Sequence, residues 1–223
     1  ALNRIRPAGT YLEERELLDV ATALRTIEAL IRFFHVGEEE EGKDTPYPHL
    51  QTLLSEVIAF PDLEKRISSL FDRFGKMKDN ASPELMNIRR ELSSIEKNIS
   101  RTLQGILRLA QSEGWVDQGV QPSVRDGRLV IPVAPAHKRK VRGIVHDESG
   151  TGKTVFIEPA EIVEANNRIR ELEAAERREI IRILIEVCDA LRPHIHDLID
   201  CYEWIGLFDF ISAKARLCGE WNA

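Results

Sequence analysis

Two long segments with an apolar residue every three or four positions constrain the fold of this chain more than any other feature. The first begins at Ser82-Pro83, because serine caps helices well and proline is favoured at the first helical position, and it runs to about Glu113. Its apolar stripe is Leu85, Ile88, Leu92, Ile95, Ile99, Thr102, Ile106 and Leu109. This heptad spacing predicts a helix about 48 Å long that needs a helical partner.

The second long segment supplies that partner. It runs from Pro159 to about Leu191, and Pro193 ends it. Its apolar positions are Ile162, Ala165, Ile169, Leu172, Ile180, Leu184, Val187 and Leu191, with one break at Glu176. The two helices are nearly equal in length, at about 48 and 49 Å. We therefore expect an antiparallel hairpin of two long helices with the intervening segment at its tip.

The intervening segment has a different character, being rich in glycine, proline and valine. Three short runs in it are β-prone, namely 129–133, 141–145 and 154–157. Outside it, the apolar spacing predicts further helices at 11–36, 49–59, 62–73 and 194–217. The last of these is rich in Ile, Leu, Phe and Tyr, so we expect it to be more fully buried than the others.

These elements predict a mainly α fold in three parts. Residues 1–114 form a helical core and the first long helix, and residues 115–159 form a β-rich insertion. Residues 160–223 form the second long helix and a returning core helix. Aromatic residues are only 6% of the chain, which favours long helices over a β sandwich.

Positive charge is concentrated in the insertion. Residues 125–153 contain seven Lys and Arg and three acids, a net of +4, which leaves −10 for the rest of a chain whose total is −6. The cations are Arg125, Arg128, Lys138, Arg139, Lys140, Arg142 and Lys153. Lys138, Lys140 and Arg142 alternate along a predicted strand and would share a face, which suits phosphates. A solvated turn with ordinary surface lysines is the alternative, and charge alone does not separate the two.

Gly152-Lys153-Thr154 is similar to the end of a P-loop, the phosphate-binding motif of many ATPases. The full motif needs a glycine five residues before Gly152, where this chain has Asp147, and a helix directly after it. The following residues are β-prone instead, and the acidic pair Asp147-Glu148 would repel a triphosphate. We interpret the segment as a β-hairpin turn and expect no cofactor in this chain.

The remaining chemistry-bearing residues predict no catalytic or metal site. His194 and His196 are two positions apart, so they point to different sides of a helix. His146 has no recognisable nucleophile paired with it. The three glutamates between 13 and 16 favour a solvated helix face.

Cysteine usage and hydropathy indicate a reducing, cytoplasmic setting. Cys188, Cys201 and Cys218 are odd in number and far apart, so neither a disulfide framework nor a metal pair is predicted. No apolar run approaches the roughly 18 residues of a membrane span, and no signal peptide is visible, so we expect no membrane partner. The chain lacks a starting methionine, and we expect it to be a piece of a longer protein.

Several blocks of the insertion are specific enough to compare with known families. One is Arg125-Asp126-Gly127-Arg128 with Ile131-Pro132-Val133, and another is His146-Asp147-Glu148-Ser149 with Phe156-Ile157-Glu158-Pro159. Further blocks are 79–85 with 88–89, Asn166-Asn167, and 209–215. Together they resemble the MutS-two branch of bacterial MutS homologues, from near residue 20 to near residue 215. The chain departs from the family's Ser-Gly-x-Thr turn by carrying Gly152-Lys153-Thr154.

The resemblance implies a core, a lever made of the two long helices, and a clamp at 115–159 that closes on nucleic acid. In the family this arm leads into an ATPase domain, which dimerises and uses ATP and Mg, and usually into a C-terminal Smr nuclease-like domain. We expect both to lie outside this chain. The resemblance also implies binding of branched or duplex DNA, restraint of homologous recombination in DNA repair, and in some bacteria rescue of collided ribosomes.

Four hypotheses for function remain. The arm grips DNA, or it grips rRNA on the ribosome, or it is a structural spacer, or it is an enzyme with an ATP site at the tip. The separation of charge favours the first two over the spacer, and Asp147 counts against the ATP site. No base-reading helix is visible, so we expect recognition of shape and backbone.

Overall fold

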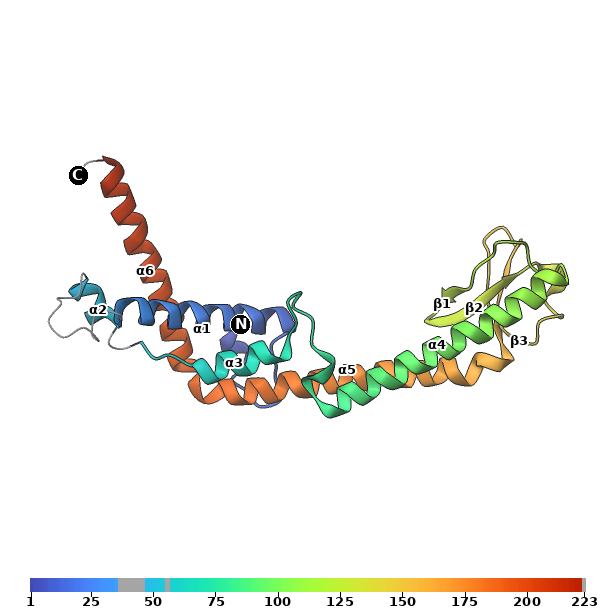
Figure 1. Ribbon diagram of the computed structural model, residues 1–223, viewed down its shortest axis with the longest axis horizontal. Helices are drawn as coiled ribbons and strands as arrows, with labels where there is room; N and C mark the ends of the chain where they lie inside the picture. Colours follow the sequence, from blue (N-terminus) through green and yellow to red (C-terminus); the bar gives the residue numbers. More distant parts are fainter. Residues whose placement is uncertain (36–46, 55–56, 222–223) are drawn as a thin grey trace. The chain divides into compact units, whose positions relative to one another are not determined.

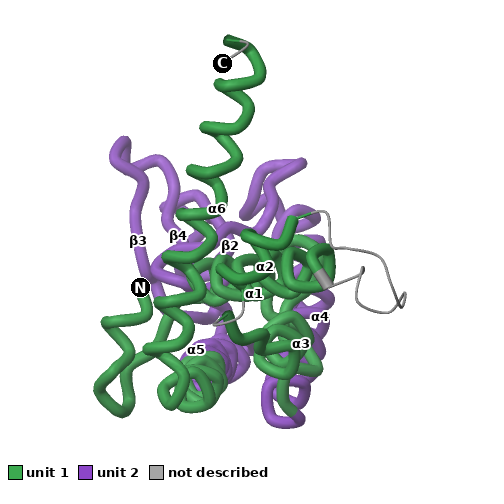
Figure 2. Tube along the Cα trace, turned by 90° about the vertical axis from the view of Figure 1, so that its left-hand side faces the viewer, with its two compact units in different colours: residues 1–82, 180–223 green, residues 83–179 purple. Residues whose placement is uncertain are grey.

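The computed structural model describes residues 1–35, 47–54 and 57–221 (Figure 1). Contacts divide the chain into two compact units, coloured separately in Figure 2. Unit 1 comprises residues 1–82 and 180–223, and unit 2 comprises residues 83–179. The described part is mainly helical and contains one small four-stranded antiparallel sheet, so the predicted mainly α class with a small β insertion is confirmed.

Unit 1 is helical. Its elements are η1 (Leu2–Ile5), α1 (Glu14–His35), α2 (Pro48–Leu54), α3 (Pro61–Leu70), η2 (Asp79–Ala81), the end of α5 (Val163–Leu191), η5 (Arg192–His194) and α6 (Ile195–Trp221). All of the helices predicted for this region are present. The predicted end of the 49–59 helix falls partly on residues 55–56, which lie outside the described residues, and residues 57–59 are not helical. The helix predicted at 62–73 ends at Leu70. None of the described helices is both long enough and apolar enough to cross a membrane.

The start of the chain is tied to the end of α5 by polar contacts inside unit 1. The Arg192 guanidinium donates to the carbonyl oxygens of Ile5 at 2.8 Å and Thr10 at 2.7 Å. The Leu12 amide donates to the buried Cys188 sulfur at 3.3 Å, and burial raises the pKa of this thiol. α1 packs against α3 and also contacts α2 and α6.

Helix α6 differs from its prediction. Its buried residues are Ile195, Leu198 and Cys201, all within the first two turns. Beyond them the helix is mostly exposed, with Phe210 and Trp221 among its exposed apolar side chains. The prediction that this helix is more fully buried is therefore wrong for most of its length, because only its first two turns are enclosed by other parts of unit 1.

Unit 2 contains the sheet. Its elements are α4 (Pro83–Ser112), β1 (Ser123–Arg125), β2 (Arg128–Val133), η3 (Pro135–His137), β3 (Gly143–Glu148), β4 (Val155–Pro159), η4 (Ala160–Ile162) and the first part of α5. The strand order is β1-β2-β4-β3, and every neighbouring pair is antiparallel. The predicted strands at 129–133 and 154–157 are present, the predicted strand at 141–145 begins two residues later, and β1 is an addition.

Two ion pairs join α4 to α5 in antiparallel order. Arg89 Nε lies 2.7 Å from Glu176 Oε1, and Arg168 Nε lies 2.8 Å from Glu91 Oε1. Glu176, which interrupts the apolar stripe of the sequence, therefore has a cationic partner on the facing helix. The two helices lie beside each other along the first half of α4 (Figure 1).

The second half of α4 shares a core with the sheet and with the start of α5. Its buried residues are Ile99, Leu103, Leu107 and Ala110, which form one core with Ile131, Val133, Val155 and Ile157. Beyond Ile99 the predicted seam is wrong at Thr102 and Leu109, which are exposed, while Ile106 packs against this core. The buried face shifts because a sheet accepts the 3.6-residue period of a straight helix, whereas the heptad seam assumes a second helix as partner.

Candidate nucleic-acid interface

A short cationic segment, residues 138–142, connects η3 to β3, and we call it the basic turn. Val141 is its one buried residue, and this side chain joins the core shared by α4 and the sheet. At the exit of the turn, the Ala160 amide donates to the Arg142 carbonyl oxygen at 3.0 Å. The basic turn is therefore fixed to unit 2 at its centre and at its end.

The backbone of the basic turn forms tight turns and is not an extended strand. The Lys138 amide donates to the Pro135 carbonyl at 3.3 Å, and the Lys140 amide donates to the His137 carbonyl at 2.9 Å. The prediction that Lys138, Lys140 and Arg142 alternate along one face of a strand is therefore wrong. Hydrogen bonds between residues three apart continue the 3-10 turn of η3 and delay the start of β3.

Five of the seven predicted contact residues have exposed side chains. They are Lys138, Arg139, Lys140, Arg142 and Lys153. Within the described part of the chain, none of the five has an acidic partner at ion-pair distance. Four of them are gathered in the basic turn. Lys153 follows the opposite end of β3, roughly 20 Å away by the rise of a six-residue strand.

Arg125 and Arg128 are engaged within the sheet. The Arg125 guanidinium lies 4.1 Å from the centre of the Phe156 ring, and its Nε lies 3.5 Å from Asp147. Arg128 donates to Glu158 at 2.7 Å and to Asn167 at 2.6 Å, and its side chain is only 18% exposed. The structure therefore separates these two cations from the five exposed ones.

Glu158 is the centre of a buried hydrogen-bond network, although it lies on β4 among apolar residues. Its carboxylate accepts from Arg128, and from the Asn166 side chain at 2.7 Å, and it lies 2.5 Å from His146 Nε2. Asn166 in turn exchanges two hydrogen bonds with the backbone of Leu129, at 3.3 and 3.1 Å. The network therefore joins β2, β3 and β4 to the first turns of α5.

The environment of Glu158 favours its charged form. Burial by itself would raise the pKa of this carboxyl, but the hydrogen bonds from Asn166, His146 and Arg128 together outweigh burial and lower the pKa below its ordinary value. A fully buried carboxylate is tolerated only when it is paired and hydrogen-bonded in this way.

Gly152-Lys153-Thr154 lies in the turn between β3 and β4. The Ser149 amide donates to the Thr154 carbonyl at 2.8 Å, and the Gly152 amide donates to the Ser149 carbonyl at 2.7 Å. Gly152 has a φ of +66°, which glycine adopts without strain. Strand β4 follows directly, where a P-loop would require a helix, so the hairpin-turn interpretation is confirmed.

His194 and His196 in unit 1 make only local contacts among the described residues. The His194 ring lies 5.1 Å from the Phe60 ring, and His196 Nδ1 lies 3.5 Å from an Asp200 oxygen one helical turn away. Across the described residues, no group of three or more His, Cys, Asp or Glu side chains is placed to hold a metal ion.

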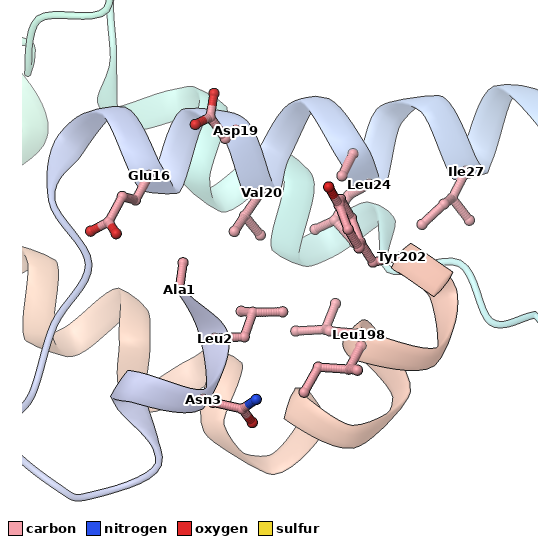
Figure 3. A pocket seen from close by; sticks show the side chains of 12 residues that line it. Ala1, Leu2, Asn3, Glu16, Asp19, Val20, Leu24, Ile27, Leu198 and Tyr202 are labelled. Atoms are coloured by element: carbon pink, nitrogen blue, oxygen red, sulfur yellow. The ribbon is translucent and has the colours of Figure 1, made fainter. Parts of the chain in front are cut away.

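A cavity of about 460 Å³ lies in unit 1 between η1, α1 and α6 (Figure 3). Leu2 and Leu198 point toward each other inside it, from η1 and α6. Of its two carboxylates, Glu16 accepts the Glu13 amide at 2.9 Å and pairs with Arg4, and these contacts lower its pKa. Glu16 therefore caps the start of α1, and the cavity is an apolar space beside a structural carboxylate.

Comparison with known proteins places these residues in a family. No family model matches the chain. Among curated proteins, it is 38% identical over 215 residues to Endonuclease MutS2 of Pelotomaculum thermopropionicum, an alignment that covers 96% of this chain and 26% of that protein. It is 38% identical to Endonuclease MutS2 of Lacticaseibacillus paracasei over 97% of the chain and 27% of that protein. The chain belongs to the MutS2 family.

The chain spans only about a quarter of the length of these MutS2 relatives. A third relative, Endonuclease MutS2 of a Geobacillus species, is 33% identical over 100% of the chain and 28% of its own length. The family assignment therefore rests on this region of the MutS2 relatives alone.

The sequence blocks that resemble MutS-two proteins meet in the Glu158 network. Arg128 comes from the first block, His146 and Glu158 come from the second, and Asn166 comes from the Asn166-Asn167 block. These residues were not predicted to act together. The available signal was Glu158 itself, an acid directly after the apolar residues of a β-prone run, which needs partners if the strand is buried.

Proposed function

We propose that unit 2 is a nucleic-acid-gripping arm of a MutS2 protein. In this proposal α4 and the facing part of α5 form the lever, and the sheet with its basic turn forms the clamp. Lys138, Arg139, Lys140 and Arg142 contact backbone phosphates, and Lys153 adds a contact at the other end of β3. Arg125 and Arg128 hold the sheet together and contribute indirectly.

The observation that carries this proposal is the set of four exposed cations in the basic turn, none with an acidic partner in the described structure. Phosphate contacts supply most of the free energy of sequence-independent nucleic-acid binding. The turn is an exposed loop rather than a helix suited to the major groove, which supports recognition of backbone and shape over base sequence.

In the longer protein, we propose that this arm grips branched or duplex DNA and thereby restrains homologous recombination. ATP and Mg would be bound by an ATPase domain outside this chain, and that domain would bring two arms together in a homodimer. The nuclease activity named for the relatives would likewise lie outside the region described.

The test is to replace Lys138, Lys140 and Arg142 together by alanine and to measure binding of duplex DNA and a four-way DNA junction by fluorescence anisotropy. Each phosphate contact contributes about −0.9 to the slope of log K against log salt concentration for duplex DNA. We expect the triple variant to lose affinity on the order of tenfold and its slope to decrease by about 2.7 in magnitude.

A matched control removes three exposed cations from α4 instead, by Lys97→Ala, Arg101→Ala and Arg108→Ala. The control has the same net charge as the test variant, and we expect it to retain the wild-type slope. Equal losses of affinity and slope in both variants would show that the net charge of the chain, and not the basic turn, drives binding. Tighter binding of an rRNA fragment than of either DNA would transfer the proposal to a ribosomal target.

A further inference from the structure

The basic turn leads into β3, and the start of that strand lies beside the backbone of Glu158. Gly143, the first residue of β3, pairs with Pro159, and Ile144 pairs with Glu158. A Cβ atom on Gly143 would lie only 2.0 Å from the Glu158 carbonyl oxygen. Such a distance is far inside van der Waals contact, so any residue larger than glycine would push β3 away from β4 at the exit of the turn.

The side chain of Glu158 fixes β3 a second time, three residues further along. The pairing of β3 with β4 shifts register between Val145 and Asp147, which leaves His146 as the extra residue of a β-bulge. His146 Nε2 lies 2.5 Å from Glu158 Oε2. One residue of β4 therefore holds both the start of β3, through its backbone, and the bulge of β3, through its carboxylate.

Glu158 is itself held against α5. Asn166 donates to Oε1 at 2.7 Å, and Arg128 bridges the same oxygen to Asn167. Because both asparagines lie in the first turns of α5, the start of β3 and the basic turn before it have a fixed position relative to that helix.

We propose that Glu158 and Gly143 are positioning residues for the basic turn, an inference that rests on the proposed function of unit 2. Neither residue contacts nucleic acid. They hold the four cations in one arrangement, so that several reach phosphates of one backbone at the same time. Without them the same charges would bind as separate, mobile groups, each of which loses side-chain entropy when it is immobilised.

The experiment compares variants of the 223-residue chain that leave every cation of the turn in place. Gly143→Ala introduces the clash with Glu158, and Gly150→Ala is its control, because a Cβ on Gly150 would meet nothing within 4 Å. His146→Ala removes one contact of the carboxylate, while His146→Gln retains a donor at a similar distance. Each variant is measured by salt-dependent anisotropy on duplex DNA, at a temperature where circular dichroism shows it fully folded.

We expect Gly143→Ala and His146→Ala to bind three- to tenfold more weakly and to lose about one to two phosphate contacts from the salt slope. Gly150→Ala and His146→Gln should retain both the wild-type affinity and the wild-type slope. Amide hydrogen exchange in residues 138–142 should become faster in His146→Ala, while exchange in α4 stays unchanged. A purely structural role would lower the melting temperature without changing the slope of the folded protein.

The outcomes separate this inference from the proposed function. If the wild-type chain binds and its slope falls in the basic-turn triple variant but not in Gly143→Ala or His146→Ala, the positioning role is wrong and the proposed function stands. If the wild-type chain has no salt-dependent affinity for DNA or RNA, both are wrong. Should Gly143→Ala fail to fold, the two His146 variants still decide the question.

Discussion

Glu158 keeps its charge in a buried position because three donors from different elements surround it. Its side chain has no exposed surface, and it accepts from Arg128 and Asn166 while it contacts His146. Removing one partner of such a group leaves an uncompensated buried charge, which typically costs about 3–5 kcal/mol. The contribution of Glu158 to the stability of unit 2 therefore depends on all of its hydrogen-bond partners being present.

The depressed pKa of Glu158 predicts how the stability of the chain depends on pH. The unfolded carboxyl has a pKa of about 4.3 and the folded one a lower value, so the unfolded chain takes up the proton first as the pH falls. The stabilisation is complete above the unfolded pKa and is lost as the pH falls through the folded pKa. We expect Glu158→Gln to be less stable than wild type at neutral pH, and the difference to shrink below about pH 4.

Urea unfolding followed by circular dichroism at a series of pH values measures this dependence. Glu161→Gln is the control, since Glu161 is an exposed glutamate three residues away. A Glu158→Gln variant whose free energy of unfolding runs parallel to wild type at every pH would contradict the prediction.

Among the elements, the hairpin of β1 and β2 and the long helix α4 use glycine in opposite ways. Asp126 and Gly127 form the two-residue loop of the hairpin with φ values of +48° and +72°, the pattern of a type I′ turn. Gly105 lies inside α4, where a Cβ would meet nothing within 4 Å. We expect Gly127→Ala to destabilise the chain by about 1 kcal/mol and Gly105→Ala to stabilise it by about 0.5–1 kcal/mol.

Each glycine variant serves as the control for the other, because each adds one methyl group to unit 2. Differential scanning calorimetry would show the melting temperature moving in opposite directions. A shift in the same direction for both would mean that the α4 position has a packing role that the open space around Gly105 does not reveal.

At the scale of elements, the sequence predicted where helices and strands lie better than it predicted what packs against them. The seam of α4 follows the prediction as far as Ile99, where α5 lies alongside, and departs from it where the sheet takes over. Periodicity identifies an apolar face but not what covers it. Asp126-Gly127 is a hairpin signal in the sequence, although β1 was not predicted. The conformation of the basic turn accompanies the burial of Val141, which no local pattern reveals.

For the candidate site, the sequence identified the cations but not their division into two groups. Seven positions share one chemistry, and only the register of the strands shows that Arg128 meets Glu158 while the cations of the basic turn are exposed. The network itself combines residues from four elements separated by up to 38 positions in the chain, from Arg128 to Asn166. Such pairings follow from tertiary structure and have no signature in spacing.

For the whole molecule, the proposed grip predicts a strong effect of valency. A single basic turn offers few phosphate contacts, so one copy of the chain should bind weakly. Two copies joined by a leucine-zipper tag should bind a four-way junction on the order of a hundredfold more tightly, because the second contact becomes intramolecular. Anisotropy titrations of tagged and untagged chains measure this ratio, and a zipper-joined chain lacking the basic-turn cations is the control. A ratio near two would contradict the two-armed grip.

Strand β3 also bears on how the molecule avoids unwanted association. It is an edge strand, and Ile144 and Val145 on it are 49% and 48% exposed. A regular apolar edge of this kind is a template on which strands of other molecules can add and aggregates can grow. The bulge at His146 interrupts the edge after three residues, so an incoming strand loses its regular hydrogen-bond spacing there. We therefore expect the carboxylate that holds the bulge to oppose the addition of further strands at this edge.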